Sequence, residues 1–201
     1  MVPYSVTSSA VPDWLEGLAR RRVLAKGDLV FRVRAPARHV FYLLRGRVVL
    51  HRYGPAGEEV VIHTAIPGEF FAEASMHGER YHCSATAAVA SEMAVVPSEA
   101  LREALASDAA FAALWTAVLS RQLRRARARV ERLSLKGAAD RVRHLLVTEG
   151  VGSRPTLQLQ GTMRELAGEL GLTHEALYRT LAAMARSGEI ARDGPTLALL
   201  R

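Results

Sequence analysis

The chain has little cysteine, no long apolar run and no signal sequence. Its 201 residues include one cysteine, Cys83, so no disulfide can form within the chain, and one subunit cannot build a four-cysteine iron–sulfur or zinc site. No apolar run reaches the roughly 18 residues of a membrane span, and the N-terminus lacks a basic end followed by an apolar signal region. We therefore expect a protein of the reducing cytoplasm with no membrane partner.

Acidic residues are also scarce relative to basic ones. The chain has 27 lysines and arginines against 20 aspartates and glutamates, a formal net charge of +7. Such a balance favours a polyanionic partner, because contacts to phosphates release counterions. Charge alone does not identify that partner. The hydrophobic fraction of 49% is sufficient for a real core.

Residues 161–190 show the pattern of two helices joined by a short turn. Thr162 and Glu165 form a capping-box pair, which starts the first helix. Thr173 is expected to cap a second helix over residues 174 to about 187. Apolar residues recur along that helix with the spacing of a core-facing stripe, namely Leu177, Leu181 and Met184. The pattern predicts a helix-turn-helix.

The opposite face of the second helix is polar in its first two turns. The residues there are His174, Glu175, Tyr178 and Arg179. Because a recognition helix meets base edges with its N-terminal residues, we assign these four a base-reading role. An ordinary helical hairpin with a solvated charged face is the alternative. Asp193-Gly194 between two short apolar runs predicts a hairpin that completes a winged helix and closes its core.

Residues 24–96 consist of short runs rich in β-branched and aromatic residues, separated by glycines. The runs are residues 29–31, 40–44, 48–50, 60–62 and 93–96, and the clearest hairpin tip is residues 53–58. Regular short strands of this kind predict an antiparallel β sandwich or roll.

A helical region is expected from Pro97 to about Leu133. Within it an apolar stripe repeats with spacings of four, three, four and three: Leu119, Leu123, Ala126, Val130 and Leu133. This stripe predicts a dimer seam, since a dimer places two recognition helices in successive major grooves. Packing of the stripe on the chain's own β-roll is the alternative. The other faces carry arginines that we expect to be solvated, although part of the run could border a ligand pocket: Arg121, Arg124, Arg125, Arg127, Arg129 and Arg132.

The order of these parts, and several segments, resemble the CRP/FNR family of bacterial transcription regulators. The similar segments are residues 26–28, 43–48, 67–73, 141–142 with 145–146, and the helix-turn-helix. The chain departs from the family at Arg34-Ala35, where Gly-Asp often stands in a roll turn. The resemblance implies an α+β fold: a β-roll like a cyclic-nucleotide-binding jelly roll (1–97), central helices with the dimer coiled coil (98–133) and a winged helix-turn-helix (134–201).

The resemblance also implies a function. It indicates a homodimeric transcription regulator that binds an inverted repeat in double-stranded DNA and works with RNA polymerase. Glu175 and Arg179 would read G·C pairs, since a carboxylate accepts from cytosine N4 and a guanidinium donates to guanine. Residues in positions that would hold phosphates are Thr162, Arg164 and Thr173. His174 and Tyr178 differ from the family's common residues, so the half-site should differ outside the central G·C contacts.

The effector does not follow from the resemblance. Tyr81 and His82 align with the Arg and Ser or Thr that hold the phosphate in cyclic-nucleotide-binding members, whereas Glu73 of that cassette is retained. Ala126 and Arg127 replace the hydroxyl residues that would meet adenine. These changes argue against a strong cAMP site, unless the loop is one residue shorter and Arg80 takes the place of Tyr81. The residues that we assign to an effector pocket are Glu73, Tyr81, His82 and Arg127.

Heme is a second effector hypothesis. His77 lies in a Met-His-Gly segment that resembles the ligand region of heme-dependent carbon monoxide sensors in the family, and Pro3 is near the N-terminus, where they use a proline. Ser75, however, stands where their exchangeable cysteine would be. A lone loop histidine is more often solvated than a ligand, so we assign no metal ligand. We interpret Cys83 as a small buried apolar residue.

The sequence gives no sign of an enzyme. It contains no nucleophile elbow, and its Ser, His and acidic residues show no catalytic spacing. A ligand-binding signalling module whose C-terminal domain contacts protein remains the alternative to a DNA-binding regulator. Effector, target promoters and the choice between activation and repression stay open.

Overall fold

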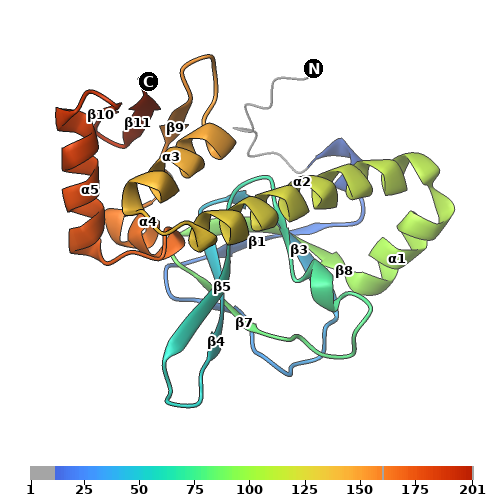
Figure 1. The fold of residues 1–201 in the computed structure, drawn as a ribbon. Coiled ribbons are helices and arrows are strands. Elements are labelled where there is room, and N and C mark those ends of the chain that lie inside the picture. The colour runs from blue at the N-terminus through green and yellow to red at the C-terminus, as the bar shows by residue number, and fades with distance from the viewer. Residues whose placement is uncertain (1–11, 160, 201) are drawn as a thin grey trace. The chain divides into compact units, whose positions relative to one another are not determined.

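The computed structural model describes residues 12–159 and 161–200, so Pro3 lies outside the described residues. The chain divides into two compact units, one up to Gln122 and one from Leu123 onward, and each is described by itself (Figure 1). No helix in the described part of the chain has the length and apolar character to cross a membrane. The three-part division at residues 97 and 133 is finer than this and stays a prediction.

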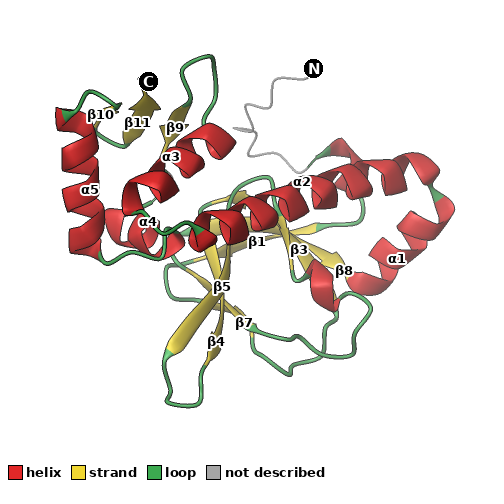
Figure 2. Ribbon diagram, in the orientation of Figure 1, coloured by secondary structure: helices red, strands yellow, loops and turns green. Residues whose placement is uncertain are grey.

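The N-terminal unit contains two four-stranded antiparallel sheets, which confirm the predicted β-roll (Figure 2). The first sheet, in spatial order, is β1 (Arg20–Leu24), β8 (Ser91–Pro97), β3 (His39–Arg45) and β6 (Phe70–Phe71). The second is β2 (Leu29–Phe31), β7 (Ser84–Ala87), β4 (Val48–Tyr53) and β5 (Glu59–Ala65). The unit also contains two short 3-10 helices, η1 (Asp13–Leu15) and η2 (Glu73–Ser75).

Strand β3 shows why this unit has a two-sided core. It runs between β8 and β6, and its residues alternate between two apolar clusters. Phe41 and Leu43 belong to the cluster that contains residues of both sheets. Tyr42 and Leu44 belong to a second cluster, which includes residues of the helices that follow the roll. Alternate residues of a strand face opposite sides, so a strand between two apolar clusters needs apolar residues on both sides. Its sequence is therefore a continuous apolar run.

The second cluster joins the first sheet to the helices α1 (Ser98–Ser107) and α2 (Ala109–Ser134). Trp115 of α2 packs on Phe70, with ring centroids 4.5 Å apart. The Gln122 amide also bonds the Phe70 backbone, accepting from its N–H at 3.1 Å and donating to its carbonyl at 2.8 Å. The start of α2 is thereby fixed to the roll of its own unit.

The predicted helical region is interrupted at Asp108. This residue is extended, with φ −123° and ψ 106°, and its carboxylate accepts from the N–H groups of Ala110 and Phe111 at 2.8 and 3.0 Å. A short polar side chain that bonds the first N–H groups of a helix favours a helix start over continuation. The region therefore forms two helices.

The roll turn at Arg34-Ala35 forms although these two residues differ from the Gly-Asp that often stands there in the family. Arg34 takes φ +68°, in the left-handed region that glycine favours, and its N–H donates to the Tyr81 carbonyl at 2.8 Å. The turn therefore forms with an arginine in a position that costs some backbone strain.

The C-terminal unit is a winged helix-turn-helix, as predicted. This unit begins with the end of α2, from Leu123 onward. Its other elements are α3 (Ala138–Glu149), β9 (Thr156–Gln158), α4 (Met163–Glu169), α5 (His174–Arg186), β10 (Ile190–Asp193) and β11 (Thr196–Leu199). The hairpin of β10 and β11 is joined by β9, which the sequence did not predict, in a three-stranded antiparallel sheet. Ile190, Leu197 and Leu199 of the hairpin are buried with Leu177 and Leu181 of α5. The hairpin thus closes the core of this unit.

Candidate nucleic-acid interface

The two helices of the helix-turn-helix begin as their capping residues predict. Thr162 accepts from the Glu165 N–H at 3.3 Å, and the Glu165 carboxylate accepts from the Thr162 N–H at 2.7 Å, which completes the capping box. Thr173 accepts from the Ala176 N–H at 3.1 Å. Each hydroxyl satisfies an N–H group that the helix itself leaves unpaired.

The turn between the helices is held by an arginine whose role the sequence did not reveal. Arg141 of α3 donates to the carbonyls of Leu170, Gly171 and Leu135 at 2.9, 3.0 and 2.8 Å. Gly171 has φ +61°, and a Cβ added there would lie 2.9 Å from Leu133 Cδ2 and 3.0 Å from the Arg141 guanidinium. The turn thus requires glycine both for its conformation and for this close approach.

Helix α5 presents the predicted polar face to solvent. Leu177, Leu181 and Met184 are at most 3% exposed, which anchors one side of the helix. The four residues that we assigned to base reading are exposed: His174, Glu175, Tyr178 and Arg179. One side of α5 is therefore held in the core of its unit, and the side that carries these four polar residues is open to solvent.

The wing adds a residue to this face that sequence reasoning missed. The rings of His174 and Tyr178 lie edge to face, with centroids 4.7 Å apart. Arg192 of β10 lies over the Tyr178 ring, with its guanidinium carbon 5.8 Å from the centroid. A guanidinium over an aromatic ring is an attractive arrangement. The hairpin thus closes the core and also contacts the polar face of α5.

The three residues that we assigned to phosphate contacts differ in whether their side chains still have a free hydrogen-bond donor. Thr162, Arg164 and Thr173 are all exposed. The Thr162 hydroxyl donates to the Glu165 carboxylate at 2.9 Å, so its proton is already used. The Thr173 hydroxyl acts as acceptor in its cap, and its proton has no acceptor among the described residues. Arg164 and Thr173 are therefore the better phosphate donors.

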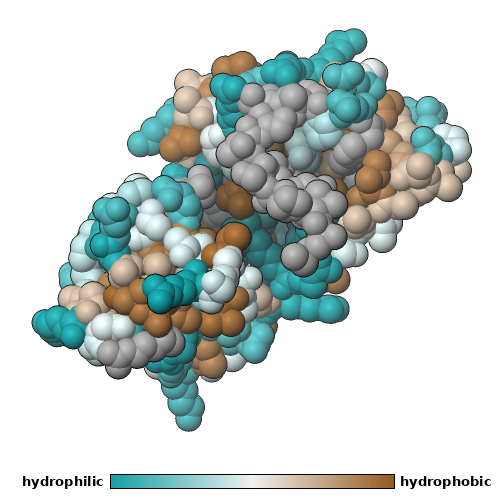
Figure 3. Space-filling view, turned by 90° about the horizontal axis from the view of Figure 1, so that it is seen from above, coloured by the Kyte–Doolittle hydropathy of each residue, from teal (hydrophilic) through white to brown (hydrophobic). Residues whose placement is uncertain are grey.

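The apolar stripe of α2 is divided between two environments. Leu119 packs on the core of the N-terminal unit. This contact agrees with the alternative prediction, in which the stripe packs on the chain's own β-roll. Leu123, Val130 and Leu133 are 51%, 67% and 39% exposed, and Ala126 is also exposed. Hydrophobic residues of other segments, such as Val23 and Val151, are also exposed, and Figure 3 shows hydrophobic residues, in brown, on the face seen from above. What distinguishes the stripe is its helical period, not exposure alone.

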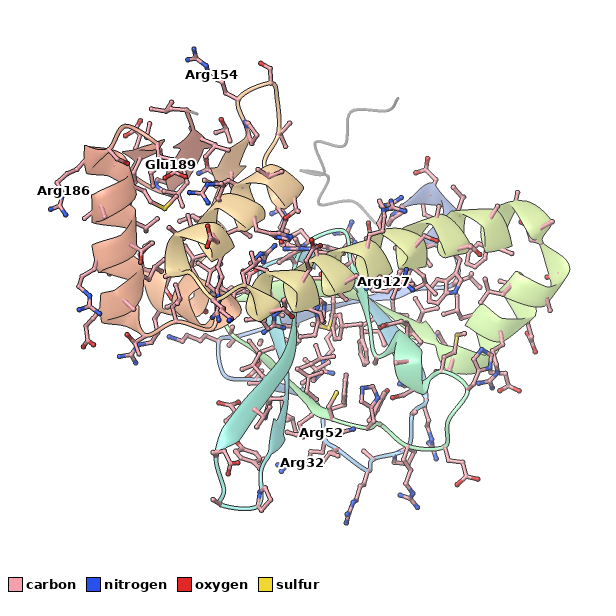
Figure 4. All side chains as sticks on the ribbon, in the orientation of Figure 1. Arg32, Arg52, Arg127, Arg154, Arg186 and Glu189 are labelled. Atoms are coloured by element: carbon pink, nitrogen blue, oxygen red, sulfur yellow. The ribbon has the colours of Figure 1, made fainter. Side chains whose placement is uncertain are left out.

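The arginines of α2 are not uniformly solvated. Arg121, Arg124 and Arg127 are exposed, and Figure 4 shows Arg127 on the helix. Arg132, however, is fully buried and forms ion pairs with Glu149 and Glu169. The expectation of a solvated face is therefore wrong for Arg132. Its carboxylate partners belong to α3 and α4, far along the sequence.

In the roll, Tyr81 is a core residue. Its ring stacks on Phe31 with centroids 3.9 Å apart. Its hydroxyl donates to the His39 carbonyl at 2.9 Å and accepts from the His39 N–H at 3.2 Å. Burial raises the pKa of Tyr81, so the hydroxyl stays protonated. The side chain for which the resemblance predicts the place of the phosphate arginine thus has a hydroxyl that the backbone already uses.

The other roll residues of the predicted pocket are half-buried. His82 bonds the Ser75 hydroxyl at 2.8 Å, and burial together with the charge of Arg52 lowers its pKa. Burial raises the pKa of the Glu73 carboxyl. Arg52 of β4 donates to the His82 carbonyl. Glu73 and His82 therefore lie in one unit, whereas Arg127 belongs to the other unit and its place at a pocket stays a prediction.

The residues considered for metal or redox chemistry have different surroundings. Cys83 is 1% exposed, and burial raises the pKa of its thiol, which agrees with a buried apolar role. His77 is exposed. Among the described residues no group of three His, Cys, Asp or Glu side chains is placed to hold a metal ion.

A β-roll followed by a winged helix-turn-helix with an open polar recognition face defines a class of protein, the DNA-binding regulators with a sensor-type domain. Residues 21–108 match the family model of the cyclic nucleotide-binding domain. The cyclic AMP receptor protein of Thermus thermophilus is 30% identical over 181 residues, which cover 88% of this chain and 81% of that protein. The chain belongs to the CRP/FNR family of transcription regulators.

Two further comparisons agree. The transcriptional activator protein Anr of Pseudomonas aeruginosa is 26% identical over 205 residues, covering 99% of this chain and 84% of that protein. The structure of FixK2 from Bradyrhizobium japonicum superposes with a TM-score of 0.73 and 22% identity, covering 91% of this chain and 93% of that one. The latter likeness bears on the fold. Together with the open face of α5, the relatives identify this chain as a DNA-binding transcription regulator.

Proposed function

We propose that the chain acts as a homodimer that binds an inverted-repeat DNA site, with one α5 in the major groove of each half-site. The observation that carries the proposal is the pairing of Glu175 and Arg179 on the open face of α5. They are one helical turn apart, at the N-terminal end that meets base edges. A carboxylate that accepts from cytosine N4 and a guanidinium that donates to guanine O6 and N7 suit G·C pairs.

The dimer rests on the stripe of α2. Leu123, Ala126 and Val130 are exposed and lie in the same compact unit as the helix-turn-helix. Burial of such a leucine contributes about 1.5–3 kcal/mol, and a seam buries several apolar residues from each of two chains. Two-fold symmetry of the protein then requires a two-fold DNA site, with half-sites about one helical turn apart.

Contacts to phosphates fix the position of the domain on DNA without reading sequence. Arg164 and Thr173 supply them, at the starts of α4 and α5. Helix N-termini also favour phosphates through their free N–H groups. Arg192 of the wing adds a positive charge beside Tyr178.

The roll, in our proposal, does not bind cAMP strongly. The Thermus thermophilus relative is named a cyclic AMP receptor protein. In our proposal, Tyr81 of this chain takes the position of the arginine that holds the phosphate in cyclic-nucleotide-binding members. Its hydroxyl is engaged by the His39 backbone, and it is a far weaker partner for a phosphate than a bidentate guanidinium. Calorimetry with cAMP should show no binding tighter than high micromolar, and DNA affinity should not depend on cAMP.

The cellular setting is also part of the proposal. A regulator of this family would act in the cytoplasm and contact RNA polymerase. One subunit cannot hold a four-cysteine iron–sulfur cluster, because Cys83 is its one cysteine. An absorbance spectrum and mass spectrometry of the purified protein would separate heme, nucleotide and no ligand in the roll.

The decisive experiment for the function is selection from random DNA with the full chain, together with sedimentation. We expect an inverted repeat with G·C pairs in each half-site, and a dimer at micromolar concentration. A pool that returns no repeated half-site, while the C-terminal unit captures protein instead, would favour a signalling module over a DNA-binding regulator.

A further inference from the structure

We infer that Arg132 is a positioning residue that fixes the spacing between the two half-sites which the dimer reads. It does so by locking the end of α2, which carries the seam, onto α4 of the helix-turn-helix. This inference rests on the proposed homodimer. It concerns the number of base pairs between half-sites, not their sequence.

Arg132 has the contacts that such a lock needs. Its side chain is 0% exposed. One end of the guanidinium bonds Glu149 and, at 3.3 Å, the Thr148 hydroxyl, both near the end of α3. The other end bonds Glu169, the last residue of α4, at 3.3 Å. One planar group thus ties three helices together.

The surroundings strengthen this arrangement. Arg125, two turns earlier on α2, reaches the second oxygen of Glu149 at 3.3 Å. Leu133 lies against the turn at Gly171, and Arg141 donates to the Leu135 carbonyl just beyond α2. The end of α2 therefore contacts α3, α4 and the turn before α5, all within one compact unit.

Stability alone does not account for a buried ion pair at this position. Burying a charge costs several kcal/mol, and well-packed apolar residues of similar volume often stabilise a protein as well or better. What a guanidinium adds is direction, because its donors lie in a fixed plane. In Arg132 both terminal nitrogens meet acceptors, whereas the buried Nε has no hydrogen-bond partner among the described residues. Apolar packing tolerates sliding and rotation that this geometry does not.

The required accuracy can be estimated. Recognition helices in successive grooves lie about 34 Å apart, so each is about 17 Å from the two-fold axis. One base pair adds about 3.4 Å, or about 1.7 Å of outward displacement per subunit. A displacement of that size of the recognition helix relative to α2 must be excluded for one spacing to be preferred. A directional lock at the junction of α2 and α4 can exclude it.

The test uses operator libraries in which the half-sites are constant and the spacer length varies. For the wild type we expect one spacer to be preferred over its neighbours by about tenfold or more, since one base pair also rotates a half-site by about 34°. Arg132→Met keeps the volume but not the donors. It should reduce that preference to about threefold or less, with half-site sequence and single half-site affinity unchanged.

Matched variants separate positioning from stability. Arg124→Met removes an exposed arginine of the same helix and should keep the wild-type preference. Arg132→Lys keeps the charge and should restore part of it. Glu169→Gln leaves the Arg132 pair with Glu149 intact, and should broaden the preference less than Arg132→Met does. If Arg132→Met fails to fold, the spacer preference of Glu169→Gln tests the positioning role in its place.

Two results would count against the inference in different ways. If folded, dimeric Arg132→Met, or Glu169→Gln where the former does not fold, keeps the sharp spacer preference, the positioning role is refuted and the proposed function stands. If the wild type itself selects no inverted repeat, the proposed function fails and this inference fails with it.

Discussion

The guanidinium of Arg192 lies over the ring of Tyr178, 5.8 Å from its centroid, and so connects the wing to the exposed polar face of α5. Tyr178 is 42% exposed, so this contact is partly solvated. The ring of His174 also contacts Tyr178, edge to face, with centroids 4.7 Å apart. The position of the Tyr178 ring is therefore set by two neighbours as well as by its own helix.

We expect this contact to appear as coupling between the two residues. In a double-mutant cycle of Tyr178→Ala and Arg192→Ala, urea unfolding should give a coupling energy of about 0.5–1 kcal/mol, the usual size for a cation–π pair at an exposed site. Tyr178→Phe should preserve it, because the ring is what the guanidinium meets. Strictly additive single effects would argue against the contact.

Glycine at the turn is expected to matter more than glycine in the helix before it. Gly171→Ala should lower the free energy of unfolding by about 1–3 kcal/mol, because alanine disfavours φ +61° and its Cβ would crowd Leu133 and Arg141. Gly168→Ala is the matched control, since a Cβ there meets nothing within 4 Å. It should stabilise α4 by up to about 1 kcal/mol. Equal effects of the two substitutions in thermal or urea unfolding would be inconsistent with this turn.

The pKa of Glu73 predicts a pH dependence of stability. Burial raises it, and the charge of Glu69 adds to that rise, while its backbone hydrogen bond and His63 oppose it. The folded protein therefore holds this proton to higher pH than the unfolded chain does. As pH rises above the ordinary value, the unfolded state loses its proton first, and the free energy of unfolding falls.

Glu73→Gln removes this titration. The difference in free energy of unfolding, variant minus wild type, should become more positive from about pH 4 to about pH 7. Urea unfolding at several pH values measures it, and titrations common to both proteins cancel in the difference. A difference that stays flat across this range would mean that burial does not raise the pKa of Glu73.

The seam can be tested with two leucines of similar exposure. Leu123 is 51% exposed and lies on the predicted seam, whereas Leu114 is 45% exposed and lies outside the stripe. Leu123→Asp should shift the protein to monomers in sedimentation, because two facing carboxylates would have to be buried. Leu114→Asp should leave the dimer intact. A monomeric wild type at micromolar concentration would remove the basis for the seam.

Local signals explain what the sequence could predict. The caps at Thr162 and Thr173 and the stripe of Leu177 and Leu181 act within a few residues, so helix starts and the buried face of α5 were readable. Strand β1 was not, because its arginines are exposed and give no apolar alternation. Strand β7, made of Ser, Ala and Thr, was missed for a similar reason.

Long-range partners explain what could not be predicted. Arg132 lies in a run of arginines, and only the fold brings Glu149 and Glu169 to it, 17 and 37 residues away along the chain. The same holds for Arg192, whose contact with Tyr178 depends on how the hairpin folds back on α5. Tyr81 was placed by alignment to a binding position, whereas its packing on Phe31 is a property of the assembled roll.

The central claim is that the face of α5 reads DNA, and base preference of three variants tests it most directly. Arg179→Ala should lose about 1–3 kcal/mol on the selected site and relax discrimination at one base pair per half-site. Arg164→Ala should weaken all sequences about equally and reduce the salt slope by about one unit per half-site. Arg186→Ala, at the far end of the same helix in Figure 4, should keep the wild-type base preference. Unchanged base preference in Arg179→Ala, measured across all single-base variants of the site, would contradict the account.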